Sequence, residues 1–134
     1  MKRVFVDTNF IIDLVARPEF SDKARSVLEL GKIRKLDFYI CFLSLANYAY
    51  IDRKNDRLKL FDNLKALTKV FHVLPNDYID IERAISINPK DFEDGIQYCS
   101  ALKGKCDCIV TRNKKDFIEF SQITVLTPDE FLNQ

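Results

Sequence analysis

The N-terminal stretch reads Lys2-Arg3-Val4-Phe5-Val6-Asp7-Thr8-Asn9 and places an acid directly after a short apolar run. The apolar run predicts a buried strand. The apolar residues from Phe10 to Val15 predict a short buried helix, which ends before Pro18 because the residue preceding a proline avoids the helical conformation. Asp7 stands at the junction, where its side chain can cap the helix or face a ligand beyond the strand.

The same alternation of strands and helices continues along the rest of the chain. The predicted strands are Lys2–Val6, Phe38–Cys41, Val70–Leu74, Cys108–Thr111 and Ile123–Leu126. The predicted helices run from a cap at Ser21 to about Lys32, from a cap at Ser44 to about Arg53, over Arg57–Lys69, from Asn76 or Asp77 to about Ser86, over Asp91–Lys103 and over Lys114–Glu119. This alternation predicts an α/β fold, a three-layer sandwich on a five-stranded, mostly parallel sheet. No linker or repeat divides the sequence, so we expect residues 1–134 to form a single domain.

Composition narrows the range of functions. The chain has 134 residues, only three glycines and a formal net charge of +1. Because the three glycines lie far apart in the sequence, the chain lacks the glycine-rich loops that bind phosphate in nucleotide-binding folds. A net charge near zero, taken alone, argues against a nucleic-acid partner. No apolar stretch is long enough to span a membrane, and an acid inside the first apolar run is unlike a signal peptide, so we expect a cytoplasmic protein without a membrane partner.

The cysteines and the single histidine are assigned to the core. Four cysteines occur in a chain that has enough Leu, Ile and Phe to fold without disulfides, and the cytosol keeps such thiols reduced. Cys106 and Cys108 are close in sequence, but no second close pair completes a zinc site. His72 alternates with apolar residues in a predicted strand, so we expect it in the core rather than in a catalytic role.

Acidic residues stand where the predicted strands end and the predicted helices begin. Asp7 ends the first strand, and Asp116 follows the fourth. Asp91 and Asp94 open the helix before the fourth strand and, three residues apart, share one helical face. Ligands of parallel sheets bind beyond the carboxyl ends of the strands, so these acids can converge on one rim, where a hard cation such as Mg²⁺ or Mn²⁺ would relieve their repulsion. Each acid also fits a structural role, as a helix cap or as a complement to a helix dipole.

Four segments of the chain resemble the PIN-domain ribonucleases, a family that includes the VapC-like toxins of bacterial toxin–antitoxin modules. The segments are Val4–Asn9, Leu43–Asn47, Asp91–Ile96 and Ile109–Phe117, in the order and at the separation that the family shows. The resemblance extends over nearly the whole chain and implies a five-stranded parallel sheet, an acidic pocket for Mg²⁺ or Mn²⁺, and endonucleolytic cleavage of RNA. It also implies a small antitoxin protein as a partner and a homodimer.

The resemblance also implies roles for individual residues. Asp7, Asp94 and Asp116 become the metal-binding, catalytic acids, which would hold one or two cations that activate water for attack on a phosphodiester. The polar residues implied as their supports are Thr8, Asn9, Ser44, Thr111 and Asn113.

One position departs from the family's pattern. The family usually has a glutamate in the helix after the second strand, where this chain has Asn47. Asp52 lies five residues further on and off that helical face, so it does not replace the glutamate. Asn47 can still offer a carbonyl oxygen to a metal, and Asp91 compensates in part if its side chain turns inward. Two interpretations follow: an active metal-dependent endoribonuclease, or a catalytically weakened PIN-like module that binds RNA or a protein.

Charge is segregated along the chain, which qualifies the near-zero total. Lys103–Lys115 contains five basic residues and one acid, whereas Asp77–Asp94 contains six acids and two basic residues. The two segments meet at the predicted rim, so the basic one can hold RNA phosphates. Arg112 would act as a planar clamp, and Lys114 and Lys115 as neutralising charges, although the lysines also fit a solvated helix face.

Two tyrosines follow Asn47 in the helix after the second strand. Tyr48 and Tyr50 can stack on an unpaired base, or they can pack between helices or at a dimer interface. The resemblance places a second copy or an antitoxin on the surface of the segment Tyr48–Phe61.

Overall fold

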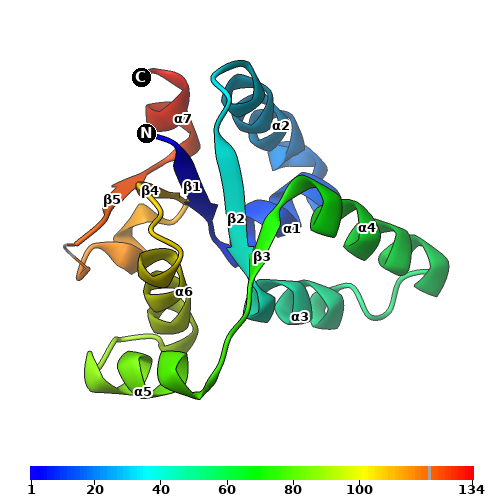
Figure 1. The fold of residues 1–134 in the computed structure, drawn as a ribbon. Coiled ribbons are helices and arrows are strands. Elements are labelled where there is room, and N and C mark those ends of the chain that lie inside the picture. Colours follow the sequence, from blue (N-terminus) through cyan, green and yellow to red (C-terminus); the bar gives the residue numbers. More distant parts are fainter. Residues whose placement is uncertain (121) are drawn as a thin grey trace.

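The computed structural model contains a five-stranded, all-parallel sheet with the strand order β3-β2-β1-β4-β5 (Figure 1). It describes residues 1–120 and 122–134. The strands are β1 (Arg3–Val6), β2 (Asp37–Cys41), β3 (His72–Leu74), β4 (Cys108–Val110) and β5 (Thr124–Leu126). The helices are α1 (Thr8–Ala16), α2 (Pro18–Ile33), α3 (Phe42–Ile51), α4 (Arg57–Val70), α5 (Tyr78–Ser86), α6 (Phe92–Lys103) and α7 (Pro128–Leu132), and η1 (Lys114–Phe117) is a 3₁₀ helix. The predicted α/β class and parallel sheet are confirmed.

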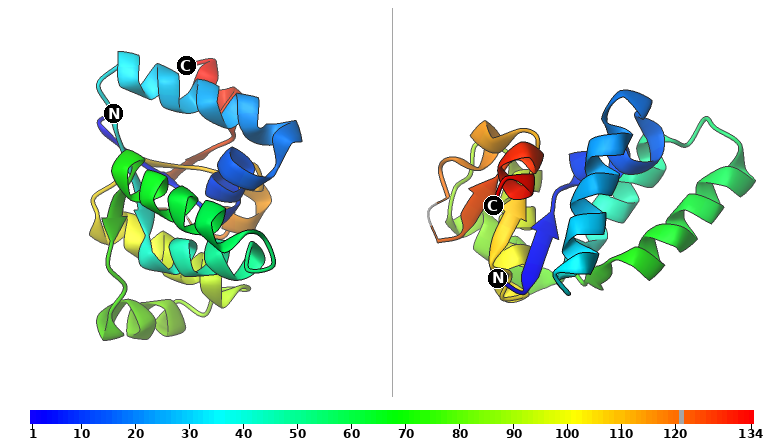
Figure 2. Two further views of the ribbon diagram at one scale, coloured as in Figure 1. Left: turned by 90° about the vertical axis from the view of Figure 1, so that its right-hand side faces the viewer. Right: turned by 90° about the horizontal axis from the view of Figure 1, so that it is seen from above.

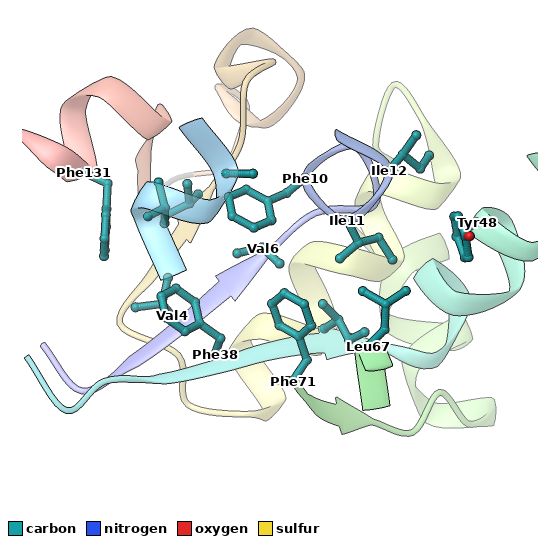
Figure 3. Packing of buried hydrophobic residues seen from close by; sticks show 14 of the residues in the cluster. Val4, Val6, Phe10, Ile11, Ile12, Phe38, Tyr48, Leu67, Phe71 and Phe131 are labelled. Carbon is teal, nitrogen blue, oxygen red and sulfur yellow. The ribbon is translucent and has the colours of Figure 1, made fainter. Parts of the chain in front are cut away.

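Side chains alternate between the two faces of β1, and each face has its own core. Val4 and Val6 point to one face, where they pack in a cluster with Leu67 of α4 and Phe131 of α7 (Figure 3). Phe5 points to the opposite face and packs in a cluster with residues of α6 and η1. Helices on both faces account for the uninterrupted apolar runs of the strands. The predicted three-layer arrangement is confirmed, with α2 and α4 on one side of β1 and η1 on the other (Figure 2).

Parallel pairing brings the carboxyl ends of β1 and β4 together. Val6 pairs with Val110 in the sheet. The residues that follow this pair, Asp7 and Thr111, therefore emerge side by side at the same edge. This edge lies beyond the strand ends, where ligands of parallel sheets bind.

Two helices begin earlier than the predicted serine caps. α2 begins at Pro18, which fits the first turn because its nitrogen needs no helical partner there, and the Ser21 hydroxyl donates to the Pro18 carbonyl. α3 begins at Phe42, directly after β2, so Ser44 lies buried inside the first turn instead of preceding it. The predicted caps at Ser21 and Ser44 are wrong for this reason.

Further differences concern short elements. α7 has no counterpart in the sequence-based prediction, although Thr127 and Glu130 form a capping box at its start. β3 is shorter than predicted because Val70 belongs to the end of α4. His72 is exposed rather than in the core, because β3 is an edge strand, and its ring stacks on Tyr39.

The apolar residues of α4 are only partly used by the core. Leu60 and Leu67 are buried. Leu58 and Phe61, two apolar residues of the same helix, are 73% and 61% exposed. α4 therefore presents apolar side chains to solvent.

The four cysteines are free and buried, as predicted. In the described part of the chain, no helix combines the length and the apolar character needed to cross a membrane.

Candidate active site

Asp7 connects β1 to α1 and is 3% exposed. Its Oδ1 accepts a hydrogen bond from the backbone N–H of Phe10 at 3.0 Å, which caps α1. Its Oδ2 accepts one from the Thr111 hydroxyl at 2.7 Å, and that hydroxyl in turn accepts one from the backbone N–H of Asn113 at 3.0 Å. Burial raises the pKa of Asp7 to about 6, although both hydrogen bonds to the carboxylate oppose the rise. Asp7 is therefore the predicted helix cap and also a buried acid that resists ionisation.

Asp94 lies in the first turn of α6 among several other carboxylates. Asp91 is the N-cap of α6, and its Oδ1 accepts a hydrogen bond from the backbone N–H of Asp94 at 3.0 Å. Burial is the largest cause of a pKa of about 7 for Asp94. The further causes are the negative charges of Asp91, Asp116, Asp7 and Glu93. The structure thus brings together the acids that the sequence places on one rim, and adds Glu93 to them.

Two hollows of the molecular surface share Asp94. One measures about 380 Å³ and is lined by Asp91, Asp116 and Lys115 as well as Asp94. The other measures about 280 Å³, and its polar lining consists of Thr8, Asn9, Asn47, Tyr50, Glu93, Asp94 and Gln97. Asp94 can therefore be reached from both hollows.

A polar network fixes the start of α1 against α3 and α6. The Thr8 hydroxyl donates to Ser44 Oγ at 2.9 Å, and the Thr8 backbone N–H donates to Gln97 Oε1 at 2.8 Å. Thr8 lines the smaller hollow, and the buried Ser44 contacts it from behind through this hydrogen bond, so their supporting roles stay predictions. Gln97 was not predicted, although its position three residues after Asp94, on the same helical face, is a signal that points to it.

Asn47 is half-buried on α3 and faces α6. Its Nδ2 donates a hydrogen bond to Oε2 of Glu93 at 3.2 Å. Asp52 accepts a hydrogen bond from the Tyr48 hydroxyl at 2.8 Å and lines a different groove with residues of α1 and α2, so it lies away from the site, as predicted. Tyr48 is fully buried and packs in the core, whereas Tyr50 is exposed and lines the smaller hollow.

The basic side chains near the site differ in their existing contacts. Arg112 donates two hydrogen bonds to the buried Asp13, from Nε to Oδ2 at 3.0 Å and from Nη2 to Oδ1 at 3.2 Å. Lys114 forms an ion pair with Glu130 at 3.1 Å. Lys115 lines the larger hollow together with the acids. The phosphate-binding roles of these three residues stay predictions, and Arg112 and Lys114 would have to exchange their present partners to perform them.

The donors around Asp94 fit a hard divalent cation. These side chains offer oxygen atoms, which Mg²⁺ and Mn²⁺ prefer, and a cation would remove the repulsion between the carboxylates. Within residues 1–120 and 122–134, no three histidine, cysteine or carboxylate side chains already close around one point.

Comparisons with known proteins give a family and similar folds. Residues 3–115 match the sequence profile of the PIN domain. The chain is 27% identical over 136 residues to Ribonuclease VapC1 of Aquifex aeolicus (strain VF5), an alignment that covers 97% of this chain and 93% of that protein. The fold is similar to that of VapBC2 from Rickettsia felis bound to a DNA fragment from their promoter, with a TM-score of 0.77, 13% identity, and coverage of 93% of this chain and 98% of that one. A toxin–antitoxin complex from Klebsiella pneumoniae gives a TM-score of 0.71, 20% identity, and coverage of 93% and 97%.

Proposed function

This chain belongs to the PIN domain family, and from that premise we propose that it is a Mg²⁺- or Mn²⁺-dependent endoribonuclease, the toxin of a toxin–antitoxin pair, acting in the cytoplasm. One observation carries the proposal: Asp91, Asp94 and Asp116 line one surface hollow, where burial and the surrounding carboxylates raise the pKa of Asp94 to about 7. Perturbed acids gathered in a surface hollow are typical of catalytic sites. The relationship to Ribonuclease VapC1 supports RNA as the substrate.

Asp7, Asp94 and Asp116 would hold the cation. When bound, Mg²⁺ or Mn²⁺ would supply an activated water and stabilise the charge that develops on the phosphate. Thr111 orients Asp7 by donating to its Oδ2, and this hydrogen bond favours the ionised form that a ligand must have. Asp94, with a pKa of about 7, carries a proton in part of the molecules at neutral pH and must release it to act as a ligand.

The RNA backbone would cross the larger hollow. Lys115 lines this hollow beside Asp94 and Asp116 and would neutralise a phosphate there. Lys114 and Arg112 would bind neighbouring phosphates when the RNA replaces their carboxylate partners. Binding through these cations should weaken as the salt concentration rises.

We propose the exposed apolar surface of α3 and α4 as the site for the antitoxin. Leu58 and Phe61 are more than half exposed and lie on this surface. A groove of about 330 Å³ separates α4 from α1 and α2, and Arg17 and Lys59 are among its lining residues. This combination suits a segment with apolar and acidic side chains. The similar structure from Klebsiella pneumoniae is a toxin–antitoxin complex.

We propose α5 as the surface for a homodimer. Tyr78, Ile79 and Ile85 are exposed on α5, which lies at the edge of the molecule beside α6 (Figure 1). Glu82 and Arg83 are exposed on the same helix, so two antiparallel copies of α5 can pair each acid with the partner's base. Light scattering on the wild type and on Ile85→Glu tests this surface, and we expect a dimer that the substitution converts to a monomer. A monomeric wild type would contradict the proposal.

RNA cleavage with and without metal tests the enzymatic activity. The protein is incubated with single-stranded RNA in Mn²⁺ or in EDTA, beside the double variant Asp7→Asn plus Asp94→Asn. We expect cleavage only by the wild type in Mn²⁺ and by a control, Asp22→Asn, which changes an exposed acid of α2. Cleavage that persists in the double variant, or none by the wild type, would contradict the proposal. RNA binding without cleavage would favour the alternative, a module weakened by Asn47.

A further inference from the structure

Glu93 is a carboxylate of the site that neither the periodicity nor the predicted ligand set includes. It is the second residue of α6, directly before Asp94, and lines the smaller hollow with Asp94 and Asn47. The Asn47 amide of α3 donates to its Oε2 at 3.2 Å. Among the described residues, Asn47 is the only hydrogen-bond partner of Glu93, so Oε1 is available to a ligand in the hollow.

We propose that Glu93 is an additional ligand of the cation, and that Asn47 is the residue that positions it. The inference rests on the proposed function and assigns a carboxylate of that same site. It places a charge from α6 on the side of the hollow where α3 offers the neutral side chains of Asn47 and Tyr50.

The electrostatics of the neighbouring acid support this placement. Glu93 is among the carboxylates whose charge acts on Asp94, together with Asp91, Asp116 and Asp7. Its charge therefore falls within the group that a cation would neutralise. Glu93 is exposed in the first turn of α6, so its side chain can turn toward a cation at little cost.

The contact between residues 47 and 93 also explains why an amide suits position 47. An amide at position 47 donates to Glu93, whereas a carboxylate there would face Glu93 at hydrogen-bond distance and repel it. Asn47→Glu alone should therefore place two repelling carboxylates in the hollow and lower the stability of the metal-free protein. The double variant Asn47→Glu plus Glu93→Gln moves the charge from α6 to α3 and keeps one carboxylate in contact with one amide.

Calorimetric titration with Mn²⁺ tests the inference, with RNA cleavage as a second measurement. The proteins are the wild type, Glu93→Gln, the Asn47→Glu plus Glu93→Gln double variant, Asp94→Asn, and Glu29→Gln as a control on α2. We expect Glu93→Gln to bind Mn²⁺ at least ~10-fold more weakly, because even the groups that orient metal ligands contribute ~10- to 100-fold to affinity. The double variant should approach the wild type, and the control should match it. Unfolding in EDTA should show each variant folded.

The outcomes separate this inference from the proposed function. Wild-type Mn²⁺ affinity in Glu93→Gln, together with loss of binding in Asp94→Asn, overturns the role of Glu93 and leaves the nuclease proposal standing. If Glu93→Gln binds Mn²⁺ weakly and the double variant binds it no more tightly, the proposed exchange of the carboxylate and the amide between α6 and α3 is wrong. A wild type that neither binds Mn²⁺ nor cleaves RNA overturns both proposals.

Discussion

The metal-free protein should become more stable when Asp94 is replaced by Asn, although the replacement removes a proposed metal ligand. Burial and the neighbouring carboxylates raise the pKa of Asp94 from 3.8 to about 7, so its ionised form is disfavoured in the folded state. A difference of this size corresponds to ~4 kcal/mol. Asp94 is only partly buried, and solvent screening reduces the expected gain to ~2 kcal/mol. The Asn side chain also loses the favourable interaction of a negative charge with the N-terminus of α6. This loss reduces the gain in the free energy of unfolding by ~0.5 kcal/mol, and the variant is still expected to be the more stable protein.

The gain should depend on pH in a defined direction. Because the pKa is raised in the folded state, the folded protein binds more protons than the unfolded chain between about pH 4 and about pH 7. The free energy of unfolding of the wild type should therefore fall as the pH rises through this window. Below about pH 4, Asp94 is protonated in both states, and the wild type and Asp94→Asn should be equally stable. Asp7, with a pKa of about 6, contributes in the same direction in both proteins.

Urea unfolding followed by circular dichroism measures this effect. In EDTA, Asp94→Asn should exceed the wild type by ~2 kcal/mol at neutral pH and match it near pH 4. Added Mn²⁺ should stabilise only the wild type, because binding to the folded state alone shifts unfolding, and this should reverse the order. Asp22→Asn should follow the wild type throughout. Equal stabilities in EDTA at neutral pH, or a difference just as large near pH 4, would refute the reasoning.

Three other substitutions test the site at Asp7, a buried ion pair of the fold and the proposed antitoxin surface. Thr111→Val removes the donor to Asp7 Oδ2 at 2.7 Å, so the pKa of Asp7 should rise further above its usual value; carboxyl NMR titration checks this, and an unchanged titration contradicts it. Lys103→Met leaves the fully buried Asp80 without its ion pair at 2.7 Å and should lower the free energy of unfolding by ~3 kcal/mol in urea; a loss typical of surface pairs, under ~1 kcal/mol, would contradict it. Phe61→Asp changes an exposed side chain and should abolish co-purification with the antitoxin while RNA cleavage stays at the wild-type level; retained co-purification would exclude this surface.

The position of the acids at the strand ends is the part of the site that the sequence predicts well. Each strand is a local apolar run, and parallel pairing then places whatever follows the strands at one edge. Val6 and Val110 pair in the structure, so Asp7 and Thr111 meet at this edge, although no local pattern predicts that β1 and β4 are neighbours. The start of α6 is also readable, because Asp91 is a favourable N-cap residue.

Contacts between helices were not predictable from local pattern. Arg112 and Asp13 are 99 residues apart, and nothing in either segment indicates that they pair. Gln97 and Glu93 reach α1 and α3 only because of the way α6 packs against them. At Ser44 the local pattern was misleading. Serine favours helix caps and so suggested a loop before residue 44, but β2 passes directly into α3.

The packing of α6 determines which part of the site can adjust to a cation. Residues Gly95–Ala101 are all buried, and Lys103 near the end of the helix donates to the buried Asp80 at 2.7 Å. These contacts hold the backbone of α6 in place at Asp94. Asp116, by contrast, is exposed on the short η1. The carboxylates of Asp94 and Asp116 repel one another, so we expect a bound cation to draw the exposed side chain of Asp116 toward Asp94.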